Sequence, residues 1–254
     1  MPQIETAKGE LFCTLAKGPK DAPVLVLVHG AGGSRLHWPP QLRRMTAATV
    51  YTLDLPGHGR SKGDGCQTID CYAEVVLAFL DAVNVDRAMV VGHSMGGAIA
   101  QTLALQADER ILSVVLVGTG ARLRVARAIL EGIRDDFEQA IDLITGYAWS
   151  PDADKSLTRL GREALLQTGS RVLLGDFVAC DRFDVMAALP EIKVPTLVIT
   201  GTADRLTPVK YARYLAKHIP DVRLVTVEGA GHMVMLERPE QVADAVREFV
   251  IAPH

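Results

Sequence analysis

The segment Gly92-His93-Ser94-Met95-Gly96 constrains the fold of this chain more than any other part of the sequence. An apolar run at 87–91 precedes it and predicts a strand, and small and apolar residues at 97–105 follow it and predict a buried helix. In a G-x-S-x-G turn between strand and helix, the chain reverses so sharply that a side chain at either glycine would collide with neighbouring backbone. The turn exposes its serine oxygen, which makes Ser94 the candidate nucleophile.

Further apolar runs predict a sheet with helices on both faces. The run at 24–28 is unbroken, as is typical of a central parallel strand that is buried on both sides. Other strands are expected at 4–6, 10–16, 50–53, 111–117, 194–200 and 222–227, and helices at about 38–46 and 69–83. Because strands and helices alternate, the sequence predicts an α/β fold with a mostly parallel central sheet.

Between the sixth expected strand and the next one, the pattern becomes helical and contains no convincing strand. We therefore expect a core domain formed by 1–118 and 194–254, with a helical cap at 119–193. Most apolar positions of the cap must form its own core, so only a few can face a substrate. The residues that we expect to contact the substrate are Trp38, Arg122, Leu123, Ile144 and Phe183.

Composition argues against several classes of partner. The chain has 254 residues, a formal net charge of −3 and no sustained run of Lys or Arg, which argues against nucleic acid or an anionic membrane as its main partner. The basic cluster at 122–134 is interpreted as the solvated side of a helix. Residues 1–17 contain no continuous apolar segment, so we expect no signal peptide, no membrane span and a cytoplasmic location. A homodimer is a candidate assembly.

The cysteines at 13, 66, 71 and 180 have neither the C-x-x-C spacing of metal sites nor the pattern of a disulfide scaffold. Free thiols in a reducing compartment are therefore the expected state. The sequence leaves open whether Cys66 and Cys71 pair with each other.

A serine hydroxyl is a poor nucleophile, so it needs a base in reach and a carboxylate that orients the base. Asp204 follows the expected strand at 194–200, and His232 follows the last expected strand. Both side chains should therefore lie beyond the carboxyl ends of a parallel sheet, where Ser94 emerges as well. His58 lies between two glycines and is interpreted as a turn residue, and Asp176 lies in the expected cap.

Acyl transfer also requires two backbone N–H donors that hold the developing oxyanion. Met95 stands at the start of a helix, where its N–H is free. Ala31, in the glycine-rich turn at 29–33, is the expected second donor, with Gly32 as the alternative. This turn matches neither G-x-x-x-x-G-K-S/T nor G-x-G-x-x-G, which argues against phosphate binding. Neither a metal nor an organic cofactor is expected.

Taken together, these motifs resemble those of the α/β-hydrolase superfamily over nearly the whole chain. The matching segments are 29–30, 54–61, 92–97, 201–204 and 229–232. The resemblance implies that Ser94 is the nucleophile, His232 the base and Asp204 its orienting acid, in the chain order of that fold. It points to the branch that holds carboxylesterases, enol-lactonases, cofactor-free perhydrolases and C–C bond hydrolases.

We therefore expect a serine hydrolase that cleaves small to medium carboxylic esters through an acyl-enzyme. The nearest alternatives are an enol-lactonase or a C–C bond hydrolase, in which Arg122 or Arg124 would pair with a substrate carboxylate, and a cofactor-free perhydrolase. A binding module that kept the fold without turnover is a further alternative, because fold does not fix function. In each of the catalytic readings the partner is a small molecule.

Overall fold

The structure is a computed structural model that describes residues 3–106 and 108–252. These residues form one eight-stranded sheet in the order β1-β2-β4-β3-β5-β6-β7-β8. β1 pairs antiparallel with β2 and β2 with β4, whereas all the other pairings are parallel. The predicted α/β fold is therefore confirmed. The strands are β1 (Gln3–Thr6), β2 (Gly9–Ala16), β3 (Val24–Val28), β4 (Thr49–Asp54), β5 (Ala88–His93), β6 (Ile111–Val117), β7 (Thr196–Gly201) and β8 (Val222–Val227).

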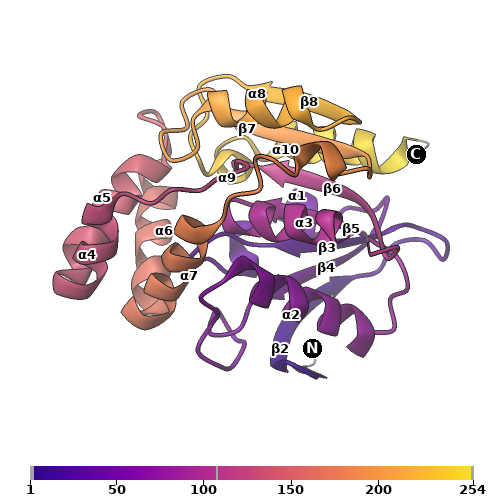
Figure 1. The fold of residues 1–254 in the computed structure, drawn as a ribbon, viewed down its shortest axis with the longest axis horizontal. Coiled ribbons are helices and arrows are strands. Elements are labelled where there is room, and N and C mark those ends of the chain that lie inside the picture. Colours follow the sequence, from indigo (N-terminus) through magenta and orange to yellow (C-terminus); the bar gives the residue numbers. More distant parts are fainter. Residues whose placement is uncertain (1–2, 107, 253–254) are drawn as a thin grey trace.

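Helices cover both faces of the sheet (Figure 1), which explains why its central strands are continuously apolar. Within β3, Val26 and Val28 pack on one face in a cluster with α2 (Ile69–Ala82), α3 (Met95–Leu105) and α8 (Val209–His218). Leu25 and Leu27 point to the opposite face and pack with α1 (Pro40–Arg43) and α10 (Pro239–Ile251). All four side chains are fully buried.

The helix expected at 38–46 is shorter in the structure and begins later. A 3₁₀ turn, η1 (Arg35–His37), precedes Trp38, and α1 begins only at Pro40. Trp38 and Pro39 are extended, with ψ angles of 127° and 159°. Each of them precedes a proline, and the proline ring clashes with a preceding residue that is helical. The two prolines therefore delay the helix.

A helical insert lies between β6 and β7, and Figure 1 shows it grouped at one end of the sheet. We use this name for α4 (Arg127–Asp135), α5 (Phe137–Ala148), α6 (Lys155–Thr168) and α7 (Ser170–Arg182). The insert has an apolar cluster of its own, centred on Ile133, Ile141 and Leu173. The 3₁₀ turn η2 (Leu189–Glu191) leads from the insert back to the sheet.

The cysteines differ in part from the expected free thiols. Cys66 and Cys71 form a disulfide, whereas Cys13 and Cys180 are free and buried. The pairing is local, since Cys71 lies in the first turn of α2 and Cys66 in the loop just before that helix. The expectation of free thiols is therefore wrong for Cys66 and Cys71 and agrees with the structure for Cys13 and Cys180.

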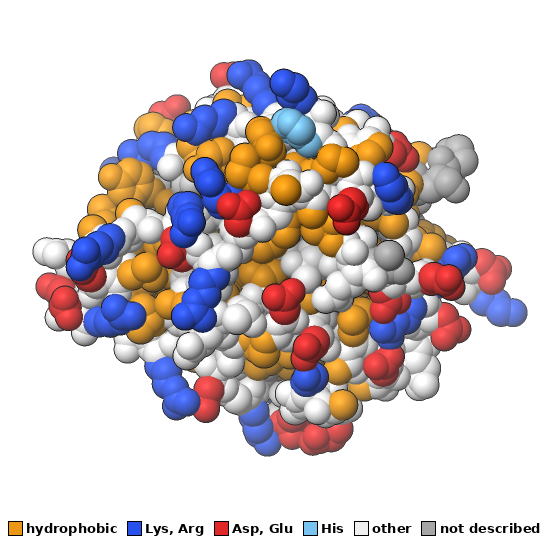
Figure 2. Space-filling model, in the orientation of Figure 1, with side chains coloured by type: hydrophobic (Ala, Val, Ile, Leu, Met, Phe, Trp, Pro, Cys, Tyr) orange, Lys and Arg blue, Asp and Glu red, His pale blue; other side chains and the backbone are white. Residues whose placement is uncertain are grey.

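The surface carries charges of both signs. On the face shown in Figure 2, acidic and basic side chains are scattered among apolar ones instead of gathering into one patch of a single sign. Within residues 3–106 and 108–252, no helix combines the length and the apolar character needed to cross a membrane.

The turn between β5 and α3 brings the start of the helix directly against the sheet. A Cβ atom on Gly92 would overlap the Gly96 carbonyl, and one on Gly96 would overlap the Val28 carbonyl. These obstacles are backbone atoms and cannot swing aside as a flexible side chain does. Ser94, between the two glycines, has a φ of 53° and a ψ of −114°, a conformation that is costly for any residue with a side chain.

We predict that Gly96→Ala lowers the free energy of unfolding by about 1–3 kcal/mol or more, because the added methyl has no space. Gly146→Ala is the matched control, since a Cβ atom at this exposed position of α5 has no neighbour within 4 Å. Alanine there is expected to stabilise the helix by about 0.5–1 kcal/mol. Urea unfolding of both variants measures the difference, and a Gly96→Ala protein as stable as the wild type would contradict the steric explanation.

Candidate active site

Ser94 stands where β5 ends and α3 begins, with its backbone fixed on both sides. Its N–H donates to the Val117 carbonyl at 2.9 Å, and its carbonyl accepts from the Thr119 hydroxyl at 2.8 Å. Both partners lie at or just beyond the end of β6. Ser94 is therefore held at the carboxyl edge of the sheet, where open α/β sheets carry their active sites.

The loops after β7 and β8 bring Asp204 and His232 together at the same edge. His232 Nδ1 lies 2.9 Å from Asp204 Oδ2, and both side chains are buried. Because a carboxylate only accepts hydrogen bonds, Nδ1 is the nitrogen that carries the proton in the neutral ring, which leaves the lone pair on Nε2. This is the tautomer that a general base requires.

The Asp204 carboxylate is held by further donors. The N–H groups of Leu206 and Thr207 donate to Oδ1 at 2.9 and 2.8 Å, and the Thr207 hydroxyl donates to Oδ2 at 2.7 Å. Burial alone raises the pKa of Asp204, but the electrostatic interaction and hydrogen bond with His232, together with the hydrogen bonds from Thr207, outweigh burial, so the pKa is lowered from its ordinary value. Asp204 is therefore ionised at neutral pH and can stabilise an imidazolium on His232.

Thr207, which was not among the site residues predicted from the sequence, contacts both members of this pair. Its hydroxyl oxygen lies 2.7 Å from Asp204 Oδ2 and 3.1 Å from His232 Nδ1. A local signal was present in the sequence. Asp204 lies shortly before the helix that begins after Pro208, with a threonine three residues after it. An aspartate in such a position commonly accepts hydrogen bonds from the N–H groups that follow it.

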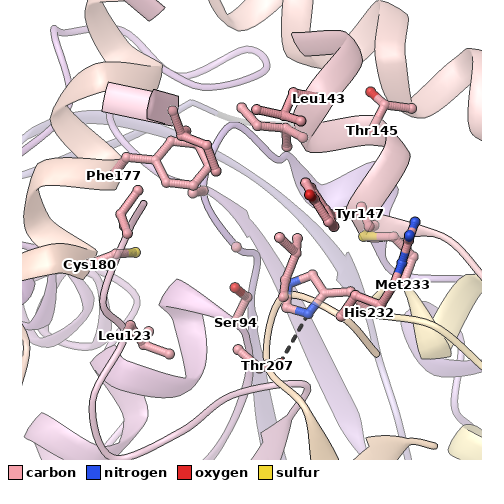
Figure 3. A pocket seen from close by; sticks show the side chains of 18 of the residues that line it. Ser94, Leu123, Leu143, Thr145, Tyr147, Phe177, Cys180, Thr207, His232 and Met233 are labelled. Atoms are coloured by element: carbon pink, nitrogen blue, oxygen red, sulfur yellow. Dashed lines mark hydrogen bonds between the residues drawn. The ribbon is translucent and has the colours of Figure 1, made fainter. Parts of the chain in front are cut away.

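Ser94 and His232 face the same cavity (Figure 3). Among the described residues no hydrogen bond joins the Ser94 hydroxyl to the imidazole. This is common in an enzyme without substrate, because catalytic hydrogen bonds often tighten only in the complex. The approach of His232 Nε2 to the serine hydroxyl therefore stays a prediction.

Two other histidines, His37 and His93, line the same cavity. Burial, followed by the proximity of other histidines, lowers the pKa of His37 to about 4 and that of His93 well below its ordinary range. Both rings are therefore neutral at pH 7, and in the described chain neither contacts a carboxylate. Among the three cavity histidines, His232 is the one with an acidic partner. No group of three or more His, Cys, Asp or Glu within the described ranges is placed to hold a metal ion.

In the glycine-rich turn after β3, two N–H groups have acceptors within the described chain. The Gly33 N–H donates to the Gly30 carbonyl at 3.0 Å, and the Gly32 N–H donates to Asp176 Oδ2 at 2.8 Å. The Gly32 N–H is thus occupied, which removes the alternative oxyanion donor. Ala31 lines the cavity beside Ser94, and Met95 begins α3, where the first N–H groups have no partner within the helix. Ala31 and Met95 remain the candidate donors.

The cavity above Ser94 has a volume of about 410 Å³ and mainly apolar walls. Of the residues expected to contact the substrate, Leu123 and Ile144 line it. The helical insert also supplies Leu143, Tyr147 and Phe177, which sequence analysis did not single out as substrate contacts and which Figure 3 shows around the same space. Aromatic and aliphatic walls of this kind bind apolar ligand groups.

The other three expected contacts lie away from the cavity wall. Trp38 is fully buried in the cluster that packs α1 and α10 on the sheet, and Phe183 is buried in the cluster on the opposite face. Arg122 pairs with Asp184 at 3.7 Å. Large apolar side chains serve a core as readily as a cavity, so their size alone did not distinguish the two.

His58 is more than a turn residue. Its ring is fully buried, and its Nε2 lies 2.7 Å from Asp176 Oδ2, on α7 of the helical insert. Residues that flank a tight turn usually contact only their neighbours, and the partner of His58 lies 118 residues away in the chain.

We predict that Thr207→Val destabilises the protein by about 1.5–3 kcal/mol at pH 7, the usual value of a hydrogen bond to a charged group. The lowered pKa of Asp204 adds stability that is complete above the unfolded carboxyl pKa of about 4 and is lost as the pH falls through the folded pKa. The effect of Thr207→Val should therefore shrink between pH 7 and about pH 3.

Urea unfolding at the two pH values measures this effect. Thr145→Val is the control, because the Thr145 hydroxyl is buried and has no hydrogen-bond partner within the described chain. Its replacement is expected to have a small effect that does not depend on pH. Equal destabilisation by Thr207→Val at both pH values would show that the hydroxyl does not act through the Asp204 charge.

Comparisons with known proteins agree with this geometry. A model of the alpha/beta hydrolase family matches residues 25–245. A pimeloyl acyl-carrier-protein methyl ester esterase of Neisseria meningitidis is 30% identical over 248 residues, which cover 91% of this chain and 95% of that protein.

Two solved structures extend the comparison. One, described as a thermophilic esterase, has 37% identity and a TM-score of 0.86, with 98% of this chain and 96% of that chain covered. The other, the enol-lactonase from Burkholderia xenovorans LB400, has 27% identity and a TM-score of 0.92, with 99% and 100% covered. With the sheet order, the serine turn and the family match in agreement, this chain belongs to the alpha/beta hydrolase family.

Proposed function

We propose that this protein is a serine hydrolase that cleaves small to medium carboxylic esters through an acyl-enzyme. The observation that carries the proposal is the buried pair of His232 and Asp204, 2.9 Å apart, whose imidazole faces the same cavity as Ser94. The esterases among the similar proteins support the same reaction class.

In the first half of the reaction, Ser94 Oγ forms a bond to the ester carbonyl carbon while its proton passes to His232 Nε2. The carbonyl oxygen becomes an oxyanion, which accepts hydrogen bonds from the N–H groups of Ala31 and Met95. When this intermediate collapses, the bond to the alkoxy oxygen breaks. The alcohol leaves with the proton that His232 returns to it.

In the second half, water takes the place of the alcohol. His232 removes a proton from the water, whose oxygen attacks the acyl carbon, and the same two N–H groups hold the second oxyanion. The bond to Ser94 Oγ then breaks, and the serine regains its proton from His232. One water molecule is consumed, and one acid and one alcohol are formed.

The same proposal assigns residues 119–193 the role of a cap that selects the acyl group by apolar contact. Leu123, Ile144 and Phe177 from this segment line the cavity. A cavity of about 410 Å³ suits a small or medium ligand, and apolar walls favour uncharged acyl groups.

Hydrolysis of an enol-lactone is the second candidate, and Arg124 is the residue that favours it. Arg124 lines the cavity, its side chain is 65% exposed, and its nearest acidic partner, Asp181, is 3.8 Å away. An exposed guanidinium of this kind can pair with a substrate carboxylate. The similarity to a solved enol-lactonase supports the same alternative.

We predict that Ser94→Ala lowers kcat for p-nitrophenyl esters by about 10⁴-fold or more, since an oxyanion hole without its nucleophile supplies only part of the acceleration. Ser113→Ala is the matched control, because Ser113 is equally a serine of the core but lies buried in β6, away from the cavity. A fluorophosphonate should label the wild type and the control but not Ser94→Ala. A folded Ser94→Ala protein that keeps more than a tenth of the wild-type rate would exclude this nucleophile.

A second prediction separates the two candidate substrates. Arg124→Ala is expected to leave kcat/KM for neutral short-chain esters nearly unchanged. Arg122→Ala removes the same charge outside the cavity wall and serves as the control.

The enol-lactonase alternative predicts a different result. If Arg124→Ala, but not Arg122→Ala, lowers kcat/KM for carboxylate-bearing lactones or esters by about 10- to 200-fold, the lactonase alternative is correct. That range corresponds to the loss of one charge-assisted hydrogen bond of about 1.5–3 kcal/mol.

A further inference from the structure

A fully buried carboxylate of the helical insert, Asp176, takes no part in the acid–base pair. It lies on α7, and its oxygens accept hydrogen bonds from three separate segments of the core domain. Its donors are the Gly32 N–H at 2.8 Å, His58 Nε2 at 2.7 Å and the Tyr72 hydroxyl at 2.5 Å. A buried carboxylate with several donors is a strongly constrained contact, because each lost donor leaves charge unpaired.

The geometry of His58 shows that Asp176 belongs to an ion pair. His58 Nδ1 lies 2.9 Å from the Pro56 carbonyl, and Nε2 lies 2.7 Å from Asp176. Both neighbours only accept hydrogen bonds, so both ring nitrogens must carry protons. Burial lowers the pKa of His58, but the charge and hydrogen bond of Asp176 outweigh burial and raise it overall. The pair is therefore an imidazolium and a carboxylate.

The insert holds Gly32 through both of its backbone groups. The N–H donates to Asp176, and the Gly32 carbonyl lies 2.9 Å from the Thr168 hydroxyl at the end of α6. That hydroxyl shares its one proton between Gly32 and the Ala164 carbonyl, which is 3.1 Å away. The two hydrogen bonds to Gly32, from Asp176 and from Thr168, cross from the insert to the turn after β3.

The side chains of the insert pack closely on the same glycine. A Cβ atom on Gly32 would lie 2.5 Å from Leu165 Cδ2 and 2.6 Å from Leu173 Cδ1, and the φ of Gly32 is +63°. The positive φ makes glycine the favoured residue at this position of the turn, and the two leucine side chains lie directly against it. The peptides on both sides of Gly32 are consequently held. The Ala31 N–H belongs to the preceding peptide, which is separated from the held Ala31–Gly32 peptide only by the φ and ψ torsions of Ala31.

Ala31 is the residue whose N–H holds the oxyanion in the proposed function. We propose that Asp176 and Thr168 are positioning residues, through which the helical insert holds the Gly30–Gly33 turn so that the Ala31 N–H points at the reacting carbonyl oxygen. The insert thus completes the oxyanion hole as well as forming the cavity wall. This inference rests on the proposed ester hydrolysis.

The test compares variants that lose a hydrogen bond to the Gly30–Gly33 turn with one that loses only another hydrogen bond to Asp176. Thr168→Val removes the hydroxyl at constant volume, and Thr168→Ser retains it. Asp176→Ala removes the acceptor, and Asp176→Asn keeps an oxygen for the Gly32 N–H. Tyr72→Phe is the matched control, because it removes one donor from the same carboxylate without contacting the turn.

The readouts are kcat and KM for a neutral p-nitrophenyl ester and the Ki of a trifluoromethyl ketone, which Ser94 converts into an oxyanion adduct. Loss of one oxyanion donor costs about 10²- to 10³-fold in kcat, and a displaced donor costs less. We expect Thr168→Val and Asp176→Ala to lower kcat by about 10- to 100-fold and to raise Ki in proportion, with KM nearly unchanged. Thr168→Ser and Asp176→Asn should recover most of the rate.

The inference is overturned if Thr168→Val and Asp176→Ala keep the wild-type kcat and Ki, or if Tyr72→Phe lowers both as strongly. It is also overturned if only KM changes. If Asp176→Ala does not fold, the comparison of Thr168→Val with Thr168→Ser decides alone. Ser94→Ala, assayed in parallel, distinguishes failure of the proposed function from failure of this inference. An active Ser94→Ala protein refutes the proposed function. An inactive Ser94→Ala protein, together with Thr168 variants that keep the wild-type kcat and Ki, refutes only this inference.

Discussion

The chain reversal at Ser94 is the constraint on which the other features of the site depend. There is room for this turn only because two glycines let backbone touch backbone, with Gly96 against the Val28 carbonyl. The reversal places a hydroxyl at the carboxyl edge of the sheet and aligns the first N–H groups of α3 behind it. The backbone conformation of Ser94 is unfavourable on its own, so it persists because the strands on either side and α3 hold it.

The fold could be predicted from the sequence where the signal is local. The strands Val24–Val28, Ile111–Val117 and Val222–Val227 have the predicted bounds, because β-branched and other apolar residues dominate each of them. Helix α2 begins at Ile69 as predicted, after Thr68, whose side chain accepts the Cys71 N–H. Asp204 and His232 could be paired in advance, because parallel strands deliver their carboxyl ends to one edge.

Contacts between distant segments could not be predicted in this way. The burial of Trp38 and Phe183 depends on which helices pack over them. The residue type alone does not reveal these packing partners. Nothing near His58 in the sequence points to Asp176, which lies 118 residues further on. The backbone of His58 does lie in a turn, as predicted. Its side-chain partner, Asp176, comes from the helical insert and therefore depends on how the insert packs on the core.

That partner also explains how the insert finds one position on the core. Apolar surfaces tolerate small shifts, because burial is not directional. A buried ion pair depends more on its geometry, and removing one partner of such a pair costs about 3–5 kcal/mol. In the structure, the insert lies where Asp176 Oδ2 is 2.7 Å from His58 Nε2. At that position the same carboxylate also accepts the Gly32 N–H, 2.8 Å away. A single buried carboxylate thus contacts both His58 and the turn beside Ser94.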